Sequence, residues 1–277
     1  MTKRVLCSKL PHLGRSEPLS ESEAHHASGV LRLRDGDVIQ ALDGKGHTAW
    51  VRLRTRQGPP RIEAVSEEEA PKIPLSEKQT TIPLTLEIAI LKGDAMEWVI
   101  EKAVELGVQK IIPLVTLRTV VRIDRKGPQE FQARWNKIAQ QALKQCGRLD
   151  QMEVSEPVSF ESHLLPTDPS PQGTPLSPRL WCDEETSTSS ENSRSSGQEI
   201  LEWLDRNSSE SNGLRILIGP EGGWDPRERE ILQTTPNTVR TYLGPVILRA
   251  ETAALYSISL TSAFLRRQLK VASKTAF

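Results

Sequence analysis

The chain has 277 residues, of which 36% are hydrophobic and 26% are charged, and its 36 Lys and Arg residues are balanced by 36 Asp and Glu residues. This balance excludes a global basic field, so any binding of nucleic acid depends on local patches. No apolar run approaches the roughly 20 residues that cross a bilayer, and the three cysteines form no C-x-x-C pair, so we expect a cytoplasmic protein without membrane association, disulfide framework or metal site.

The first 72 residues alternate polar and apolar positions, a pattern that indicates strands. Residues 37–54, DVIQALDGKGHTAWVRLR, predict two strands joined by a turn at residues 43–46, and residues 20–34 predict a short helix. Prolines around an acidic run at residues 58–80 are typical of a domain boundary. We therefore expect a small barrel-like β domain over residues 1–72 and a second domain over residues 73–277.

Strands and helices alternate in the second domain. Asp94 and Glu97 predict a capping box for a helix that ends at Gly107. Cys146, on the apolar stripe of a second helix, and Cys182, in a short strand, are expected to be buried. The alternation predicts an α/β fold with a mostly parallel sheet covered on both faces. Strands are expected at residues 82–90, 108–115, 180–183, 214–219 and 238–244, and helices at 94–106, 130–146, 225 onward and 250–268, with a disordered Ser-rich insert near 186–198.

A glycine-rich turn, LIGPEGGW, follows a predicted strand at residues 217–224. Such a turn can be purely structural. The chain has neither GxGxxG nor GxxxxGK[ST], so the common phosphate cradles are absent. Glu221 would repel a phosphate held against the turn. The pattern therefore favours a neutral or cationic ligand, such as a nucleoside with a positive centre or S-adenosylmethionine.

A second loop, YLGPVILRAETAAL at residues 242–255, repeats the order of strand, Gly-Pro and helix. Loops that leave neighbouring parallel strands meet at one edge of the sheet, the usual ligand crevice of α/β folds. Arg249 would supply a cation there, or else form a surface ion pair. Glu251 would supply a carboxylate, or else only a favourable charge at a helix N-terminus. Apolar walls for a flat base would come from Leu243, Val246, Ile247 and Leu248.

Four motifs follow one another in the order of a known family: KGDAMEWVIEKAVELGVQKIIPL, QCGR, LIGPEGG and LGPVILRAETA. Together they resemble the RsmE family of 16S ribosomal RNA uridine-N3 methyltransferases, in the SPOUT superfamily, over nearly the whole chain. The resemblance implies a SPOUT domain with a deep trefoil knot around its mostly parallel sheet and an N-terminal PUA-like RNA-binding barrel. It also implies S-adenosylmethionine as cofactor, a homodimer, and 16S ribosomal RNA or the small ribosomal subunit as partner.

The chemistry of methyl transfer to N3, together with the resemblance, gives roles to individual positions. Arg249 would stabilise negative charge on the uracil oxygens. Glu251, a weaker candidate, or Glu221 could take the N3 proton, so the base stays unassigned. The family usually has Thr where this chain has Ala250, so a hydroxyl role there is in doubt. The cofactor-binding residues would be Leu217, Ile218, Gly219, Pro220, Glu221, Gly222, Gly223, Leu243, Gly244, Val246, Ile247 and Leu248.

Basic residues at local positions are the candidates for RNA contacts. Residues 1–65 hold eleven Lys and Arg against seven Asp and Glu, a net charge of +4 in a neutral chain. An ordinary solvated face would explain the same excess. Further basic residues of the second domain lie at the ends of elements, where members of the family that the chain resembles carry similar basic residues, and they are candidate phosphate contacts. The predicted RNA-binding residues are Arg32, Arg34, Arg52, Lys92, Arg118 and Arg148.

Three other functions stay open at this stage. A SPOUT methyltransferase could act on another RNA, such as tRNA. A non-catalytic RNA-binding protein would bind RNA without the cofactor, although the intact Gly-Pro loops argue against it. An α/β enzyme that uses a phosphorylated nucleotide is disfavoured by Glu221 and by the absent phosphate motifs.

Overall fold

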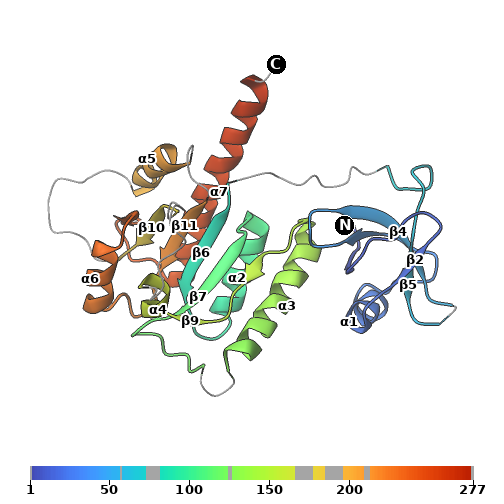
Figure 1. Ribbon diagram of the computed structural model, residues 1–277, viewed down its shortest axis with the longest axis horizontal. Helices are drawn as coiled ribbons and strands as arrows, with labels where there is room; N and C mark the ends of the chain where they lie inside the picture. Colours follow the sequence, from blue (N-terminus) through green and yellow to red (C-terminus); the bar gives the residue numbers. More distant parts are fainter. Residues whose placement is uncertain are drawn as a thin grey trace. The chain divides into compact units, whose positions relative to one another are not determined.

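The computed structural model describes residues 2–56, 58–72, 82–123, 127–165, 177–184, 196–208 and 213–275. It divides into an N-terminal unit, Met1–Gln79 with Gln140–Gln151, and a C-terminal unit, Thr80–Ala139 with Met152–Phe277 (Figure 1). The predicted boundary between residues 72 and 73 falls at the edge of segment 73–81, outside the described residues. Most of the predicted Ser-rich insert also lies outside them, and residues 196–198 begin a helix.

The N-terminal unit contains a five-stranded sheet with the order β1-β3-β4-β5-β2. β1 runs parallel to β3, and the other neighbours are antiparallel. The predicted hairpin is confirmed as β3 and β4, but a path with β1 and β2 at its ends does not confirm a closed barrel. The strands are β1 (Arg4–Leu6), β2 (Ser16–Pro18), β3 (Val38–Leu42), β4 (Thr48–Arg54) and β5 (Arg61–Ala64).

Two short helical segments and a helix end complete the N-terminal unit. The predicted short helix is confirmed as α1 (Glu21–His25), which continues as the π-helical turn η1 (His26–Val30). Arg4 donates to the carbonyls of Lys144 and Gln145 at 3.1 and 3.0 Å, at the end of α3 (Pro128–Cys146). These bonds satisfy carbonyls that a helix end leaves without partners.

The C-terminal unit contains a seven-stranded sheet in which every pairing is parallel. Its order is β12-β10-β11-β6-β7-β8, and β9 also pairs with β7. The prediction of a mostly parallel sheet is therefore confirmed. The strands are β6 (Leu84–Ala89), β7 (Lys110–Val115), β8 (Glu153–Val154), β9 (Val158–Ser159), β10 (Arg179–Cys182), β11 (Leu214–Ile218) and β12 (Thr238–Thr241).

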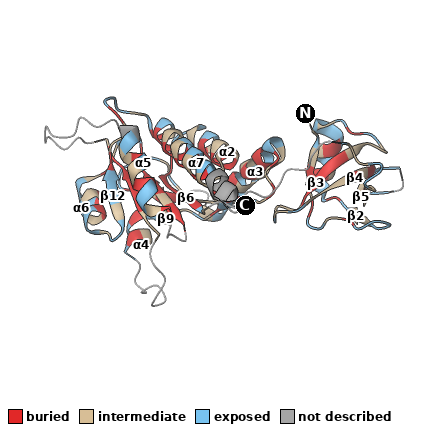
Figure 2. Ribbon diagram, turned by 90° about the horizontal axis from the view of Figure 1, so that it is seen from above, coloured by how far each residue is buried: buried red, intermediate tan, exposed pale blue. Residues whose placement is uncertain are grey.

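Helices cover both faces of this sheet (Figure 1). α2 (Ala95–Leu106) contacts α7 (Ala250–Thr275), and α7 contacts β6 and β11. On the other face, residues of α4 (Phe160–Leu164) and α6 (Pro226–Thr234) join one apolar cluster with Trp181 and Leu217 of the strands. Buried residues accordingly follow the strands in Figure 2. Among the described helices, none has both the length and the hydropathy of a membrane span.

α2 confirms its predicted apolar stripe but not its predicted start. Its stripe is buried and Gly107 ends it with φ 91°, a left-handed conformation that suits glycine. Asp94 has φ −83° and ψ −6° and makes no side-chain cap, so the predicted capping box is wrong. Instead, Glu97 forms an ion pair with Arg134 of α3.

Two further expectations are corrected. Cys146 is exposed, not buried, because the buried side of α3 is formed by Trp135, Ala139, Ala142 and Leu143. The tract before residue 213 also contains an unpredicted helix, α5 (Ser196–Asn207), which buries Ile200, Trp203 and Leu204. Their spacing of three and four residues was the available signal. Cys182 is buried as predicted.

A carboxylate is buried within the parallel sheet. The side chain of Glu87, on β6, is fully buried. It accepts from Nε of Arg179 at 2.6 Å and from Nη1 of Arg215 at 3.0 Å, and His163 Nε2 lies 2.9 Å from Oε1. Burial alone would raise the pKa of Glu87, but hydrogen bonds from His163 and Arg179 outweigh it and lower the pKa to about 2. We call Glu87, Arg179, Arg215 and His163 the Glu87 cluster.

Candidate active site

The carboxyl ends of β10, β11 and β12 lie side by side because these strands are parallel neighbours. The segments that leave them surround a pocket of about 620 Å³. This volume is within the range of small-molecule sites. The lining residues are Ala95, Cys182, Asp183, Glu184, Ile218, Gly219, Pro220, Glu221, Gly222, Gly223, Tyr242, Leu243, Val246, Ile247, Leu248, Arg249, Ala250, Glu251 and Ala253.

The glycine-rich turn is held by packing that only glycine permits. A Cβ added to Gly219 would lie 2.8 Å from the ring of Trp224. Trp224 is buried, and its Nε1–H donates to the carbonyl of Cys182 at 3.0 Å, which ties the turn to the end of β10. Gly223 has φ 69°, and its N–H closes the turn on the carbonyl of Pro220 at 2.9 Å. The backbone of residues 219–223 is therefore fixed along one wall of the pocket.

Glu221 has a structural partner at the edge of this pocket. Its Oε1 accepts from the backbone N–H of Lys92 at 2.9 Å, so the carboxylate joins the turn to the loop between β6 and α2. Arg118 holds the same turn from the other side, because its Nη1 donates to the carbonyl of Gly222 at 2.8 Å. The turn therefore has a carboxylate anchor and a guanidinium anchor, and neither requires a phosphate.

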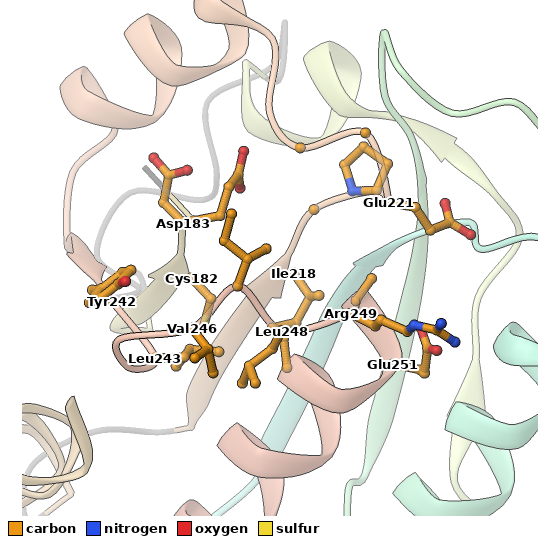
Figure 3. Close-up of a pocket in the computed structure, with 18 of the residues that line it drawn as sticks. Cys182, Asp183, Ile218, Glu221, Tyr242, Leu243, Val246, Leu248, Arg249 and Glu251 are labelled. Atoms are coloured by element: carbon orange, nitrogen blue, oxygen red, sulfur yellow. The ribbon is translucent and has the colours of Figure 1, made fainter. Parts of the chain in front are cut away.

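The second loop supplies the apolar wall and the cation. Val246 and Ile247 are 64% and 77% exposed, and with Leu243 and Leu248 they line the pocket. Arg249 immediately precedes α7, and Glu251 lies in its first turn. Figure 3 shows these two side chains next to each other, on the same side as Glu221 and away from Asp183 and Tyr242. In the described part of the chain, no carboxylate lies within ion-pair distance of Arg249.

Two residues assigned to the pocket by sequence do not line it. Leu217 is fully buried in the apolar cluster on the opposite face of the sheet, because neighbours on a strand point to opposite faces. Gly244 is buried and does not reach the lining. The other ten predicted cofactor residues line the pocket with Arg249 and Glu251.

The contribution of β10 to the pocket was not predicted from the sequence. Asp183 and Glu184 line the pocket, and both bind Arg229, at 3.1 and 2.7 Å. Asp183 also pairs with Arg240 at 2.7 Å. Two consecutive acids directly after a buried strand were the available signal. Burial raises the pKa of the Cys182 thiol to about 12, so this pocket residue is no nucleophile at neutral pH.

The predicted RNA-binding residues fall into two groups. Lys92 and Arg118 are exposed beside the glycine-rich turn. The other four lie in the N-terminal unit, where Arg32 and Arg34 are exposed. Arg52 is bound to Glu69 at 2.6 Å, and Arg148 is largely buried and bound to Asp150 at 2.9 Å. These two cations are therefore less available to a phosphate.

Comparison with known proteins connects this geometry to a family. Residues 77–262 match a family of RNA methyltransferase domains. The chain is 32% identical to the ribosomal RNA small subunit methyltransferase E of Bacillus subtilis (strain 168) over 248 residues, which are 88% of each chain. It is 28% identical over 257 residues to the enzyme of the same name from Rickettsia conorii, covering 91% of each chain.

A solved structure resembles the whole chain. The crystal structure of a ribosomal RNA small subunit methyltransferase E from Neisseria gonorrhoeae bound to S-adenosylmethionine has a TM-score of 0.70 and 25% identity, over 94% of this chain and 96% of that one. The matching domain, the identity to curated relatives and the shared fold agree with one another. The chain therefore belongs to the family of ribosomal RNA small subunit methyltransferases E.

Proposed function

We propose that the protein methylates N3 of a specific uridine in 16S ribosomal RNA with S-adenosylmethionine as the methyl donor. The single observation that carries the proposal is the composition of the pocket at the sheet edge. Its walls are apolar, its acids are Asp183, Glu184, Glu221 and Glu251, and its only basic residue among the described lining is Arg249. Such a lining suits a cationic nucleoside better than a polyphosphate.

The residues present fit S-adenosylmethionine. The backbone of residues 219–223 runs along one wall without side chains at its three glycines, so a flat ligand can approach it closely. Leu243, Val246 and Leu248 offer apolar surface to a base. Glu221 and Glu251, which form no ion pair in the described residues, suit the positive sulfonium and amino groups. When bound, S-adenosylmethionine would supply a methyl group attached to its sulfonium sulfur. The loss of that methyl group would turn the sulfonium into a neutral thioether, the leaving group.

Arg249 is assigned the stabilisation of the reacting uracil. The N3 lone pair becomes a nucleophile only when the N3 proton leaves, and negative charge then spreads over the two uracil oxygens. A guanidinium fixed beside that charge lowers the barrier in the way an oxyanion site does. Arg249 has no carboxylate partner in the described residues, so its charge is available for this purpose. Glu251, beside it in Figure 3, is the candidate that accepts the N3 proton.

The target uridine must be unpaired when it reacts, because N3 lies inside a Watson–Crick pair. Sequence-specific RNA recognition generally uses such splayed-out bases. Lys92 and Arg118 are exposed at the edge of the pocket and would contact the neighbouring phosphates. Arg32 and Arg34, which are exposed on the N-terminal unit, would contact other phosphates of the RNA.

The trefoil knot, the two domains, the homodimer and the cytoplasmic location are part of the same proposal. After the edge strand β12, α7 contacts β11 and β6, so the chain returns across the sheet, as the threading of a trefoil knot requires. The mixed sheet of residues 4–64 supports a PUA-like domain over residues 1–72, followed by the SPOUT domain over 73–277.

The exposed Val246 and Ile247 support a homodimer surface, and three free cysteines support the cytoplasm as location.

The ligand choice is tested by titration calorimetry with S-adenosylmethionine, with ATP as the competing candidate. We expect S-adenosylmethionine to bind and ATP not to bind. Val246→Arg, which adds bulk and positive charge to the pocket wall, should weaken that binding at least about tenfold, roughly 1.4 kcal/mol. Leu201→Arg adds the same group at an exposed apolar position of α5 outside the pocket and should have no effect. Tight binding of ATP would favour an enzyme that uses a phosphorylated nucleotide, and binding of neither ligand would favour a non-catalytic RNA-binding protein.

A further inference from the structure

A second cavity, of about 420 Å³, lies entirely within the N-terminal unit. It is made by the start of the chain, the loop before β3, the strands β3 and β4, and the segment that follows β5. Its lining is mixed, with five apolar residues, one hydroxyl, one cation and one carboxylate. The lining residues are Thr2, Lys3, Leu33, Asp37, Val38, Ile39, Trp50 and Pro71.

Trp50 gives this cavity an aromatic wall. Along β4, Val51 and Leu53 point into the core, so Trp50 and Arg52 project from the other face of the sheet. Trp50 stays half-exposed, although burial of a tryptophan is strongly favourable. Aromatic side chains in such positions are the usual stacking platforms for unpaired bases.

Asp37 gives the cavity a hydrogen-bond acceptor. Its Oδ2 accepts from the backbone N–H of Arg34 at 2.8 Å, which fixes the carboxylate. Its Oδ1 makes no hydrogen bond within the described residues. A carboxylate accepts from the amino groups of base edges. The cavity therefore suits a base with an exocyclic amino group better than uracil.

One cation, Lys3, lines the cavity, and two more, Arg32 and Arg34, are sequence neighbours of a lining residue. In the described part of the chain, Lys3, Arg32 and Arg34 form no ion pair, whereas Arg52 and Arg54 are bound to Glu69 and Glu63. Arg32 and Arg34 flank Leu33, which lines the cavity. Lys3 in the lining and the exposed Arg32 and Arg34 next to it in sequence are therefore the candidates for phosphate contacts beside a bound base.

The backbone of Arg32 is strained. Its φ is 51°, in the left-handed region that residues other than glycine rarely occupy. Strain of this kind persists where the surrounding fold enforces it and is concentrated at functional sites. The strained residue here is one of the free cations beside the cavity.

We propose that this cavity binds an unpaired nucleotide of the substrate RNA, distinct from the uridine that is methylated. The base stacks on Trp50, its amino group donates to Asp37, and its flanking phosphates contact Arg32, Arg34 and Lys3. The N-terminal unit thereby reads one base of the target instead of only attracting its backbone. This inference depends on the proposed function, because it assumes an RNA substrate.

The test compares Trp50→Ala, Trp50→Phe and Asp37→Asn with the wild-type protein. Methyl transfer to small ribosomal subunits that lack the modification gives KM for RNA, and calorimetry gives Kd for S-adenosylmethionine. We expect Trp50→Ala to raise KM for RNA about tenfold, in line with the loss of one stacked base. Trp50→Phe should restore most of the loss, and Kd for S-adenosylmethionine should not change. Lys45→Ala, which removes an exposed cation at the opposite end of the β3–β4 hairpin, is the matched control and should leave both constants unchanged.

Direct binding separates this inference from the proposed function. Fluorescence-labelled single-stranded oligomers of A, C, G or U are titrated onto wild-type protein, Trp50→Ala and Asp37→Asn. Asp37→Asn should reduce the preference for bases with amino groups over U, which a purely structural role of Asp37 would not change. Unchanged KM in a folded Trp50→Ala, or binding that is indifferent to both positions, would overturn the inference. Failure of the proposed function would appear differently, as no methyl transfer by the wild-type protein.

Discussion

Replacing Arg249 with alanine should lower kcat for methyl transfer by about 10²–10³-fold, the usual cost of removing one donor from an oxyanion site. Arg249 lines the pocket next to Glu251 and has no carboxylate partner in the described residues. Its loss removes the positive charge that stabilises deprotonated N3, while the apolar wall and the glycine-rich turn stay in place. The affinity for S-adenosylmethionine should therefore change little.

The pH dependence of the same variant distinguishes the assigned role from a structural one. Without Arg249, removal of the N3 proton depends more on the solvent, so the rate should gain more from a rise in pH than the wild-type rate does. Arg227→Ala, which removes an exposed guanidinium from α6 outside the pocket, is the control and should keep wild-type kinetics. If Arg249→Ala instead abolishes cofactor binding, Arg249 is a cofactor-binding residue and not the stabiliser.

Replacing Glu87 with glutamine should destabilise the C-terminal unit by about 3–5 kcal/mol, because it leaves the guanidinium groups of Arg179 and Arg215 without their counter-ion. Urea unfolding followed by tryptophan fluorescence measures this change. Glu230→Gln, at an exposed position of α6, is the matched control and should stay within about 0.5 kcal/mol of wild type. An equally small effect of Glu87→Gln would show that the Glu87 cluster adds no net stability.

The pKa of Glu87 also sets a pH window for stability. Because the folded pKa, about 2, lies below the ordinary value of 4.5, ionised Glu87 stabilises the fold above about pH 4.5. That contribution, about 3 kcal/mol, is lost as the pH falls from about 4.5 through 2. The wild-type protein should therefore lose stability over this range, and Glu87→Gln should lack this component of the loss.

Local patterns predicted the parts of the fold that local physics determines. The apolar stripe of α2, its end at Gly107 and the β3–β4 hairpin depend on residues close in sequence, and all three are confirmed. The capping box failed because Asp94 has helical backbone angles, φ −83° and ψ −6°, and its side chain makes no cap bond, while Glu97 pairs with Arg134 of another helix. The exposure of Cys146 likewise depends on which side of α3 meets its neighbours, which periodicity alone did not resolve.

In the candidate site, too, features set by nearby residues were predicted, and contacts between residues distant in sequence were not. The two Gly-Pro loops were found from sequence because glycine and proline punctuate strand ends in an α/β fold, and the parallel order of the strands brings the loops together. The bonds around them could not be predicted, since Lys92 is 129 positions from Glu221, and Asp183 is 46 from Arg229. Glu221 is therefore compatible with the glycine-rich turn for a reason invisible in the sequence: one of its oxygens accepts the N–H of Lys92.

The most direct test of the proposed function is the identity of the methylated nucleoside. Small ribosomal subunits that lack the modification are incubated with the protein and S-adenosylmethionine, and their 16S ribosomal RNA is digested and analysed by mass spectrometry. We predict one new N3-methyluridine per RNA, with none formed by Arg249→Ala on the same timescale and none in tRNA treated in parallel. Methylation at another atom or base, methylation of tRNA instead, or no methylation at all would contradict the assignment.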